Sequence, residues 1–220
     1  MIRALIFDFD GLILDTEGPI YRSWTEVYEA HGVALPFELW VKTVGSSNQA
    51  FHPQHHLEER LGRPLAEEVI NRRVERRIEL VLAQALLPGV AERVDEAGAA
   101  GLKVGVASSS SRDWVNGHLQ RLGLLARFDC IRCRDDVEHV KPEPDLYLAV
   151  VDCLGVPANE AVAIEDSPNG ITAAKRAGLL CVAIPNPITA GLDLRAADLR
   201  LESLAEVTLQ ELLDRLSQTK

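Results

Sequence analysis

The segment that most constrains this chain is an apolar run at residues 4–9, which carries Asp8 and is followed at once by Asp10. A short run of bulky apolar residues predicts a buried strand, with the two aspartates at its C-terminal end. In open α/β sheets, ligands bind at that end. Side chains two positions apart point to the same side, and like charges so close require a cation or a proton. Gly11 then permits a sharp turn, so we expect a functional site here.

From residue 89 onward, apolar runs of strand length alternate with amphipathic helical segments. The expected strands cover residues 103–107, 129–133, 161–164 and 180–184. The expected helices cover residues 90–100, 114–122, 144–154 and 169–177, and a last helix carries the leucines between 204 and 216. Such alternation predicts an α/β fold, with a Rossmann-like parallel sheet covered by helices on both faces.

A helical block interrupts this pattern directly after the first strand. Ile20, Trp24, Val27 and Tyr28 fall at helical spacing, and further helices are expected over residues 37–44, 54–61 and 69–85. We therefore predict a catalytic core made of residues 1–16 and 88–220, with an inserted all-helical cap domain at residues 17–87. An insertion at this point lies over the strand ends, where it can exclude water and select the substrate.

Bulk properties exclude some classes of function. The formal net charge of −10 argues against a nucleic-acid surface, which needs clustered Lys and Arg. No apolar stretch approaches the roughly 20 residues needed to span a bilayer, so we expect no membrane contact and a cytoplasmic protein. For oligomeric state we expect a monomer or a weak dimer.

The four cysteines are Cys130, Cys133, Cys153 and Cys181. The CxxC spacing of Cys130 and Cys133 is compatible with a redox pair or with half of a metal site. However, the pair falls in an expected strand, and no second CxxC is present. We expect ordinary buried thiols, as in a reducing compartment.

Residues with functional side chains follow the other expected strands as well. Ser108 follows the second strand, Lys141 lies after the third, and Glu165 and Asp166 end the fourth. The C-terminal ends of parallel strands share one rim, so the topology brings these residues together with the first two aspartates. Taken singly, Ser108 reads as a helix cap, Lys141 as a surface charge, and the Glu165–Asp166 pair as a cap of the next helix.

Together these residues suit phosphoryl transfer. Carboxylates with no nearby His or Cys favour a hard cation, chiefly Mg²⁺, with Asp8 and Asp166 as ligands and Glu165 in support. An aspartate can act as a covalent nucleophile. A second carboxyl two residues away can protonate the leaving oxygen and then activate water. The Ser108 hydroxyl and the lysine can hold phosphate oxygens.

The order of these motifs resembles the haloacid dehalogenase superfamily, most of whose members are phosphatases. The motifs are Asp8-x-Asp10-Gly, a helical insertion, Ser108 after a strand, Lys141-Pro-x-Pro, and Glu165-Asp166-Ser-x-x-Gly. The chain is most similar to the capped branch that includes β-phosphoglucomutase-like and phosphoglycolate-phosphatase-like enzymes.

That resemblance implies a role for each residue. Asp8 would be the nucleophile and Asp10 the general acid and base. Mg²⁺ would be held by Asp8, the backbone carbonyl of Asp10 and Asp166, with support from Glu165. The transferring phosphate would be held by Ser108, Ser109 and Lys141.

The resemblance also bears on the reaction. Dehalogenases and phosphonate-cleaving members lack the second aspartate, which is present here as Asp10. Related mutases usually carry a His early in the first cap helix and an Arg in the cap loop. By position these fall near Ile20 and Asn48, so both are absent. This favours a phosphatase acting on a small, sugar-like phosphorylated metabolite, with a phosphosugar mutase as the alternative. A non-enzymatic binding module is disfavoured because every acidic residue is present.

Substrate selection is expected in the cap, around Ser46, Ser47 and Asn48. The nearby segment of His52, His55 and His56 could bind a metal, but Pro53 interrupts helical pairing and no further ligand has suitable spacing. We expect a surface loop or a helix start there, with a substrate contact from one His as an open alternative.

Overall fold

A central parallel sheet organises the computed structural model, which describes residues 1–41 and 51–218. Its strand order is β3-β2-β1-β4-β5-β6, and every neighbouring pair is parallel. The strands are β1 (Ala4–Phe7), β2 (Lys103–Ala107), β3 (Cys130–Arg132), β4 (Ala161–Glu165), β5 (Leu180–Ala183) and β6 (Leu199–Arg200). The predicted Rossmann-like α/β fold is confirmed, and the aspartate-bearing strand lies at its centre.

Helices cover both faces of the sheet, because alternate strand residues point to opposite sides. Leu5 and Phe7 face one hydrophobic cluster, and Ala4 and Ile6 face the other. The first face is covered by α5 (Val90–Ala99), α6 (Arg112–Arg121) and α9 (Leu209–Ser217). The second is covered by α7 (Asp145–Leu154) and α8 (Pro168–Arg176).

The second face is lined by small strand residues, which lets its helices approach closely. A Cβ on Gly105 would lie 2.6 Å from Val150 Cγ1 on α7. Such tight packing fixes the position of α7 relative to the strands, and with it the side chains that α7 directs toward the sheet.

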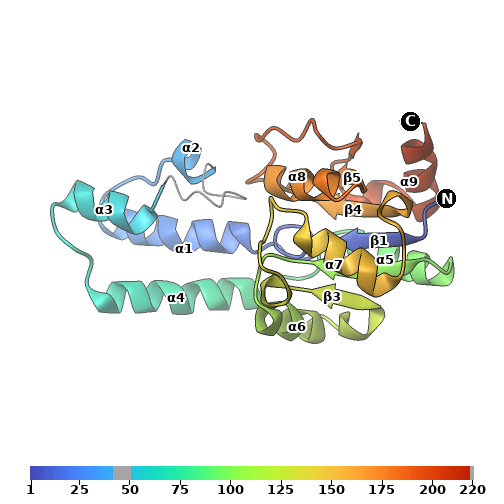
Figure 1. The fold of residues 1–220 in the computed structure, drawn as a ribbon. Helices are drawn as coiled ribbons and strands as arrows, with labels where there is room; N and C mark the ends of the chain where they lie inside the picture. Colours follow the sequence, from blue (N-terminus) through green and yellow to red (C-terminus); the bar gives the residue numbers. More distant parts are fainter. Residues whose placement is uncertain (42–50, 219–220) are drawn as a thin grey trace.

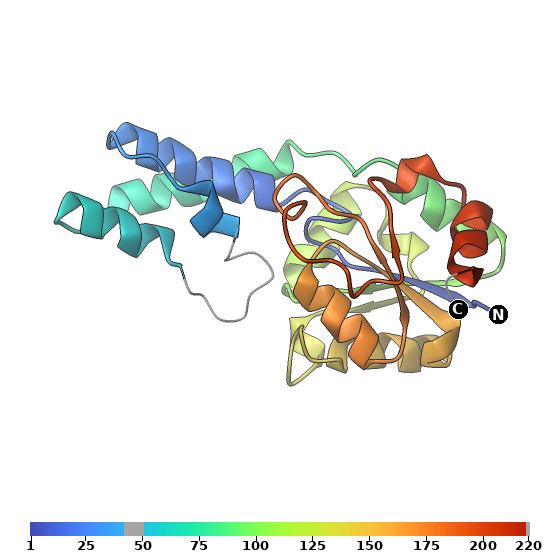
Figure 2. The same cartoon turned by 90° about the horizontal axis from the view of Figure 1, so that it is seen from above.

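The cap consists of α1 (Glu17–Ala30), α2 (Phe37–Trp40), α3 (Pro53–Leu61) and α4 (Glu67–Leu82). These helices extend away from the sheet on the side where the β1 strand ends (Figures 1 and 2). They share a hydrophobic cluster of their own, built around Trp24, Tyr28, Trp40 and Leu57. The chain passes from the sheet to the cap before α1 and returns after α4. These two connecting segments lie side by side, since Leu87 N donates to Ile13 O at 3.0 Å.

One residue of the core belongs to the cap cluster. Ile188, in the loop after β5, is 7% exposed and packs with the aromatic side chains of the cap. This contact links the loop after β5 directly to the cap.

The structure corrects three expectations. The leucines between 204 and 216 are divided between a 3₁₀ turn, Leu204–Glu206, and α9, because Thr208 and Glu211 form a capping box that starts a new helix. The short edge strand β6 was not expected. Cys130 and Cys153, expected as thiols, form a disulfide that joins β3 to α7, while Cys133 and Cys181 are free and buried.

Within the described part of the chain, no helix is both long and apolar enough to cross a bilayer.

Candidate active site

The C-terminal ends of the central strands bring the sequence-predicted acids together. Asp8, Glu165 and Asp166 are buried, and each offers a carboxylate oxygen within 4.8 Å of the others. We call these three residues the acidic cluster. Asp8 directly follows β1, and the other two end and follow the neighbouring strand β4, so their meeting is a consequence of strand order.

Lys141 compensates part of this charge from the loop before α7. Its Nζ contacts Asp8 Oδ1 and lies 2.6 Å from Glu165 Oε1. Burial alone would lower the pKa of Lys141, but the carboxylates of Asp8 and Glu165 outweigh it and raise that pKa above its ordinary value. Lys141 is therefore a fixed cation at the floor of the site.

Glu165 is the orienting member of the acidic cluster. Its Oε1 also accepts the hydroxyl of Tyr147 on α7 at 2.6 Å, and its Oε2 accepts Ser167 Oγ at 3.3 Å. Gly170 makes room for it, since a Cβ there would lie 1.9 Å from the carboxyl carbon. Because both oxygens of Glu165 already have hydrogen-bond partners in the protein, its direct contact is with Lys141, which it holds in position.

Asp166 is held by a residue that the sequence did not reveal. Asn186 Nδ2 donates to Asp166 Oδ2 at 2.7 Å and to Gly11 O at 3.2 Å. Gly11 has φ +84°, and a Cβ on it would lie 2.3 Å from Asp166 Oδ2. The glycine after the two aspartates thus serves both the turn and the close approach of Asp166.

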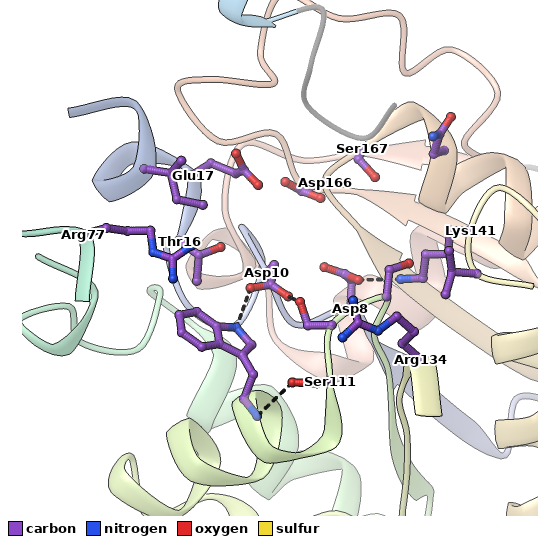
Figure 3. Close-up of a pocket in the computed structure, with 16 residues that line it drawn as sticks. Asp8, Asp10, Thr16, Glu17, Arg77, Ser111, Arg134, Lys141, Asp166 and Ser167 are labelled. Carbon is purple, nitrogen blue, oxygen red and sulfur yellow. Dashed lines mark hydrogen bonds and ion pairs between the residues drawn. The ribbon is translucent and has the colours of Figure 1, made fainter. Parts of the chain in front are cut away.

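Asp10 is oriented by three hydrogen-bond donors, and Figure 3 shows two of these hydrogen bonds. Trp114 Nε1 donates to its Oδ1 at 2.9 Å, and Ser110 Oγ donates to its Oδ2 at 2.7 Å. Ser108 Oγ lies 3.4 Å from Oδ2. These donors fix the orientation of the Asp10 carboxylate, which is not a member of the acidic cluster.

The serine loop, residues 108–111, divides its functions. Ser108 is fully buried and its Oγ accepts the backbone N–H of Ser110 at 3.0 Å, whereas Ser109 lines the pocket. The helix cap is Ser111, which accepts Trp114 N at 3.4 Å. Ser109 is therefore better placed than Ser108 to meet a ligand with its side chain.

Asp8, Asp10, Ser109, Lys141 and Asp166 line a cavity of about 630 Å³ between the sheet and the cap. The cap contributes Glu17 and Ile20 from α1 and Arg77 from α4 (Figure 3). Burial, together with the charges of Asp10 and Asp15, raises the pKa of Glu17 to about 7. Glu17, Arg77, Trp114, Tyr147, Arg134 and Asn186 were not singled out as site residues from sequence.

Ser46, Ser47 and Asn48, expected to select the substrate, lie outside the described residues. The histidine segment does not line the cavity among the residues described. His56 Nδ1 lies 2.9 Å from the hydroxyl of Tyr28, and the rings of His52 and His55 contact each other with centroids 5.4 Å apart. Their visible role is in the packing of α3.

The acidic cluster fits a hard divalent cation. Burial raises the pKa of Asp8 to about 8 despite the contact with Lys141. Burial and the charges of Asp8 and Glu165 likewise raise the pKa of Asp166. Without a cation, the ionised forms of these buried carboxylates are unfavourable. The acidic cluster offers only oxygen donors, which are the ligands that Mg²⁺ or a similar cation prefers.

Comparisons with known proteins agree with this geometry. A family model described as haloacid dehalogenase-like hydrolase matches residues 2–178. The Bacillus subtilis (strain 168) protein "Putative phosphatase YhcW" is 48% identical over 218 residues, covering 99% of both chains. Hexitol phosphatase B of Escherichia coli (strain K12) is 34% identical, covering 96% of this chain and 97% of its own length. A crystal structure of a "putative beta-phosphoglucomutase" from Thermotoga maritima superposes with a TM-score of 0.78 at 28% identity, covering 97% of this chain and 99% of the other.

The strand order, the paired aspartates and the family match over most of the chain lead to one assignment: this chain belongs to the haloacid dehalogenase-like hydrolases.

Proposed function

We propose that this chain is a Mg²⁺-dependent phosphatase that hydrolyses a small phosphorylated metabolite through an aspartyl-phosphate on Asp8. The observation that carries the proposal is the juxtaposition of the acidic cluster with Lys141 and with a separately oriented Asp10. Relatives named as phosphatases support the reaction class.

The side chains fit the two halves of this reaction. Asp8 attacks phosphorus and becomes the phosphorylated residue. Asp10 gives a proton to the leaving alcohol and then takes one from the attacking water, as its hydrogen bonds to Trp114 and Ser110 keep it aimed into the cavity. A Mg²⁺ ion held by Asp8, Asp166 and the backbone carbonyl of Asp10 would offset the charge of the phosphate.

Lys141, Ser109 and the buried Ser108 complete the proposed phosphate site. Lys141 offsets part of the negative charge of the nucleophile and Glu165, which favours the approach of an anion to an otherwise acidic floor. Ser109 faces the cavity, and Ser108 holds the shape of the loop by accepting Ser110 N. The phosphate would lie between this loop and the acidic cluster.

Mutase activity is the second candidate, because a solved structure similar to this chain is named as a putative beta-phosphoglucomutase. Ile20 lines the cavity at the place where the resemblance expects a histidine, and its side chain cannot exchange a proton. This favours water over a sugar hydroxyl as the phosphoryl acceptor. Glu17 and Arg77 offer an acceptor and a donor to a polyhydroxylated leaving group, which favours a sugar or polyol phosphate.

The first experiment measures release of phosphate from p-nitrophenyl phosphate with Mg²⁺, with EDTA, and in Asp8→Asn. We expect EDTA to abolish turnover and Asp8→Asn to lower kcat by ~10³-fold or more, since the amide is not a nucleophile. The exposed Asp152→Asn, on the surface of α7, is the matched control and should retain full activity. Undiminished turnover in Asp8→Asn would reject the mechanism.

A second measurement separates the two candidates. A panel of sugar and polyol phosphates is incubated with the enzyme, and both free phosphate and isomerised ester are measured. Phosphate release without isomerisation is expected of the phosphatase. Isomerised hexose phosphate that forms only when a hexose bisphosphate is added would identify a mutase instead.

A further inference from the structure

Arg134 is a cavity-lining residue to which neither the sequence motifs nor the proposed chemistry assigns a role. It begins the 3₁₀ turn Arg134–Asp136 directly after β3, and it lines the same cavity as Asp8, Lys141 and Ser109. In the close-up its side chain extends into the site on the side of Asp8 and Lys141, opposite Glu17 (Figure 3). Among the described residues, none forms an ion pair or hydrogen bond with its guanidinium.

The turn that carries Arg134 is fastened to the serine loop. Arg134 N donates to Ser110 O at 3.0 Å, and Arg112 N donates to Asp135 Oδ2 at 2.6 Å. The Arg112 guanidinium also pairs with Asp136, whose other oxygen accepts Cys133 N at 2.8 Å. Both acids next to Arg134 are therefore engaged with other groups, and the guanidinium of Arg134, an exposed residue, has no ion-pair partner among the described residues.

Several donors near the acidic cluster are already engaged by protein acceptors. Lys141 is engaged by two carboxylates, and the hydroxyls of Ser108 and Ser110 are directed at Asp10. A phosphate dianion must nevertheless enter a cavity that is also lined by Asp8, Asp10, Glu17 and Asp166. A guanidinium at the wall supplies both positive charge and a planar pair of N–H donors, which match two phosphate oxygens.

We propose that Arg134 binds the phosphate group of the substrate and of the released product. This role rests on the proposed phosphatase function and adds to it a phosphate-binding residue outside the motifs. Since the contact is to the phosphate and not to the alcohol, its contribution should be the same for esters of different alcohols. The bond from Arg134 N to Ser110 O holds the turn of Arg134 against the serine loop, whose Ser109 lines the same cavity.

The test measures binding of inorganic phosphate by calorimetry in the presence of Mg²⁺, and KM for two esters, p-nitrophenyl phosphate and glycerol 2-phosphate. Arg134→Ala should weaken phosphate binding by about 10-fold or more, and should raise KM for both esters by a similar factor. Arg134→Lys should recover part of the loss, because it restores charge without the planar fork. The control is Arg127→Ala, which removes an exposed arginine that pairs with Asp95 outside the cavity, and it should match wild type.

Phosphate binding by Arg134→Ala equal to that of Arg127→Ala would overturn the proposal, as would a rise in KM for only one of the two esters. The proposed function fails differently: the wild type would then release no phosphate from any ester. The calorimetric comparison of the variants would still decide the role of Arg134 in that case. Thermal unfolding of each variant verifies that the substitutions at Arg134 and Arg127 leave the fold intact.

Discussion

Gly170 shows how one missing side chain sets the geometry of the acidic cluster. Glu165 turns its carboxylate back toward the first turn of α8, where a Cβ on residue 170 would lie 1.9 Å from its carboxyl carbon. This carboxylate holds Lys141 and Tyr147 at the same time. The sequence pattern Glu-Asp-Ser-x-x-Gly is thus explained by the space that Glu165 needs.

We predict that Gly170→Ala displaces Glu165, and through it Lys141. Activity toward p-nitrophenyl phosphate should fall by ~10²-fold or more, and the unfolding free energy by about 1–3 kcal/mol, because a small-to-large change at a tight contact forces its neighbours to move. Activity assays and urea denaturation measure the two effects.

The matched control is Gly117→Ala, within α6, where a Cβ meets no atom within 4 Å. Alanine is the better helix former, so this variant should be as stable as wild type or more stable, with unchanged activity. Equal behaviour of the two alanine variants would contradict the account of Glu165.

At the scale of elements, the disulfide joins the edge strand β3 to α7 and encloses the loop that carries Lys141. The two cysteines are separated by 23 positions, so the cross-link restricts a long stretch of the unfolded chain. Cys153 lies on the exposed side of α7, where a reductant can reach it.

We predict that Cys153→Ser lowers the unfolding free energy by about 3 kcal/mol under oxidising conditions, the value the chain-entropy model gives for a loop of this length. Urea denaturation with and without dithiothreitol measures it. In the reductant the wild type should fall to the level of the variant. An equal unfolding free energy of the wild type with and without dithiothreitol would show that the disulfide does not stabilise the fold.

The strands show what the sequence could and could not predict. Uniformly apolar runs predicted the bounds of the central strands to within a residue or two, as for β2. A strand that is buried on both faces is apolar along its whole length, which makes it recognisable in the sequence. The two-residue β6 has too few residues for such a signal. The capping box of Thr208 and Glu211 starts a new helix, but the leucines on either side keep helical spacing and so conceal the break in the sequence.

The candidate site was predictable only where a residue belongs to a motif. Asp8, Lys141, Glu165 and Asp166 lie together as the motifs imply, whereas Asn186, after β5, and Arg134, after β3, belong to no motif. Tyr147 sits on a helix and reads as an ordinary core residue until the fold brings its hydroxyl to Glu165. Likewise, the cysteines are expected as thiols from sequence, because sequence does not determine disulfide connectivity, and the fold brings Cys130 to Cys153.

At the scale of the whole molecule, the loop after β5 connects the acidic cluster with the cap. Asn186 Nδ2 donates to Asp166, and Asn186 Oδ1 accepts the backbone N–H of Ile188 at 2.9 Å. Ile188 in turn packs into the hydrophobic cluster of the cap. The acidic cluster is therefore connected through Asn186 and Ile188 to the packing of the cap. We expect that binding of a cation to the acidic cluster changes the stability of the entire fold.

The metal-free protein carries a pH-dependent cost at this cluster. The pKa of Asp8 is raised to about 8, and that of Asp166 is also raised, so folding disfavours their ionised forms. Without metal, this contribution to stability should decline as the pH rises from about 4, the ordinary aspartate pKa, through about 8. A divalent cation reverses the preference, because it binds the ionised carboxylates and must compete with protons for them.

We therefore predict that Mg²⁺ raises Tm, and that the increase is larger at about pH 8.5 than at about pH 6, where protons hold the ligands. At a Mg²⁺ concentration of about 100 times Kd, binding should stabilise the fold by about 2.7 kcal/mol. Thermal unfolding with EDTA or Mg²⁺ at the two pH values measures it, with Asp166→Asn expected to lose most of the increase and Asp152→Asn to keep it. A Tm increase that is equal at both pH values would mean that the cation binds somewhere other than these coupled carboxylates.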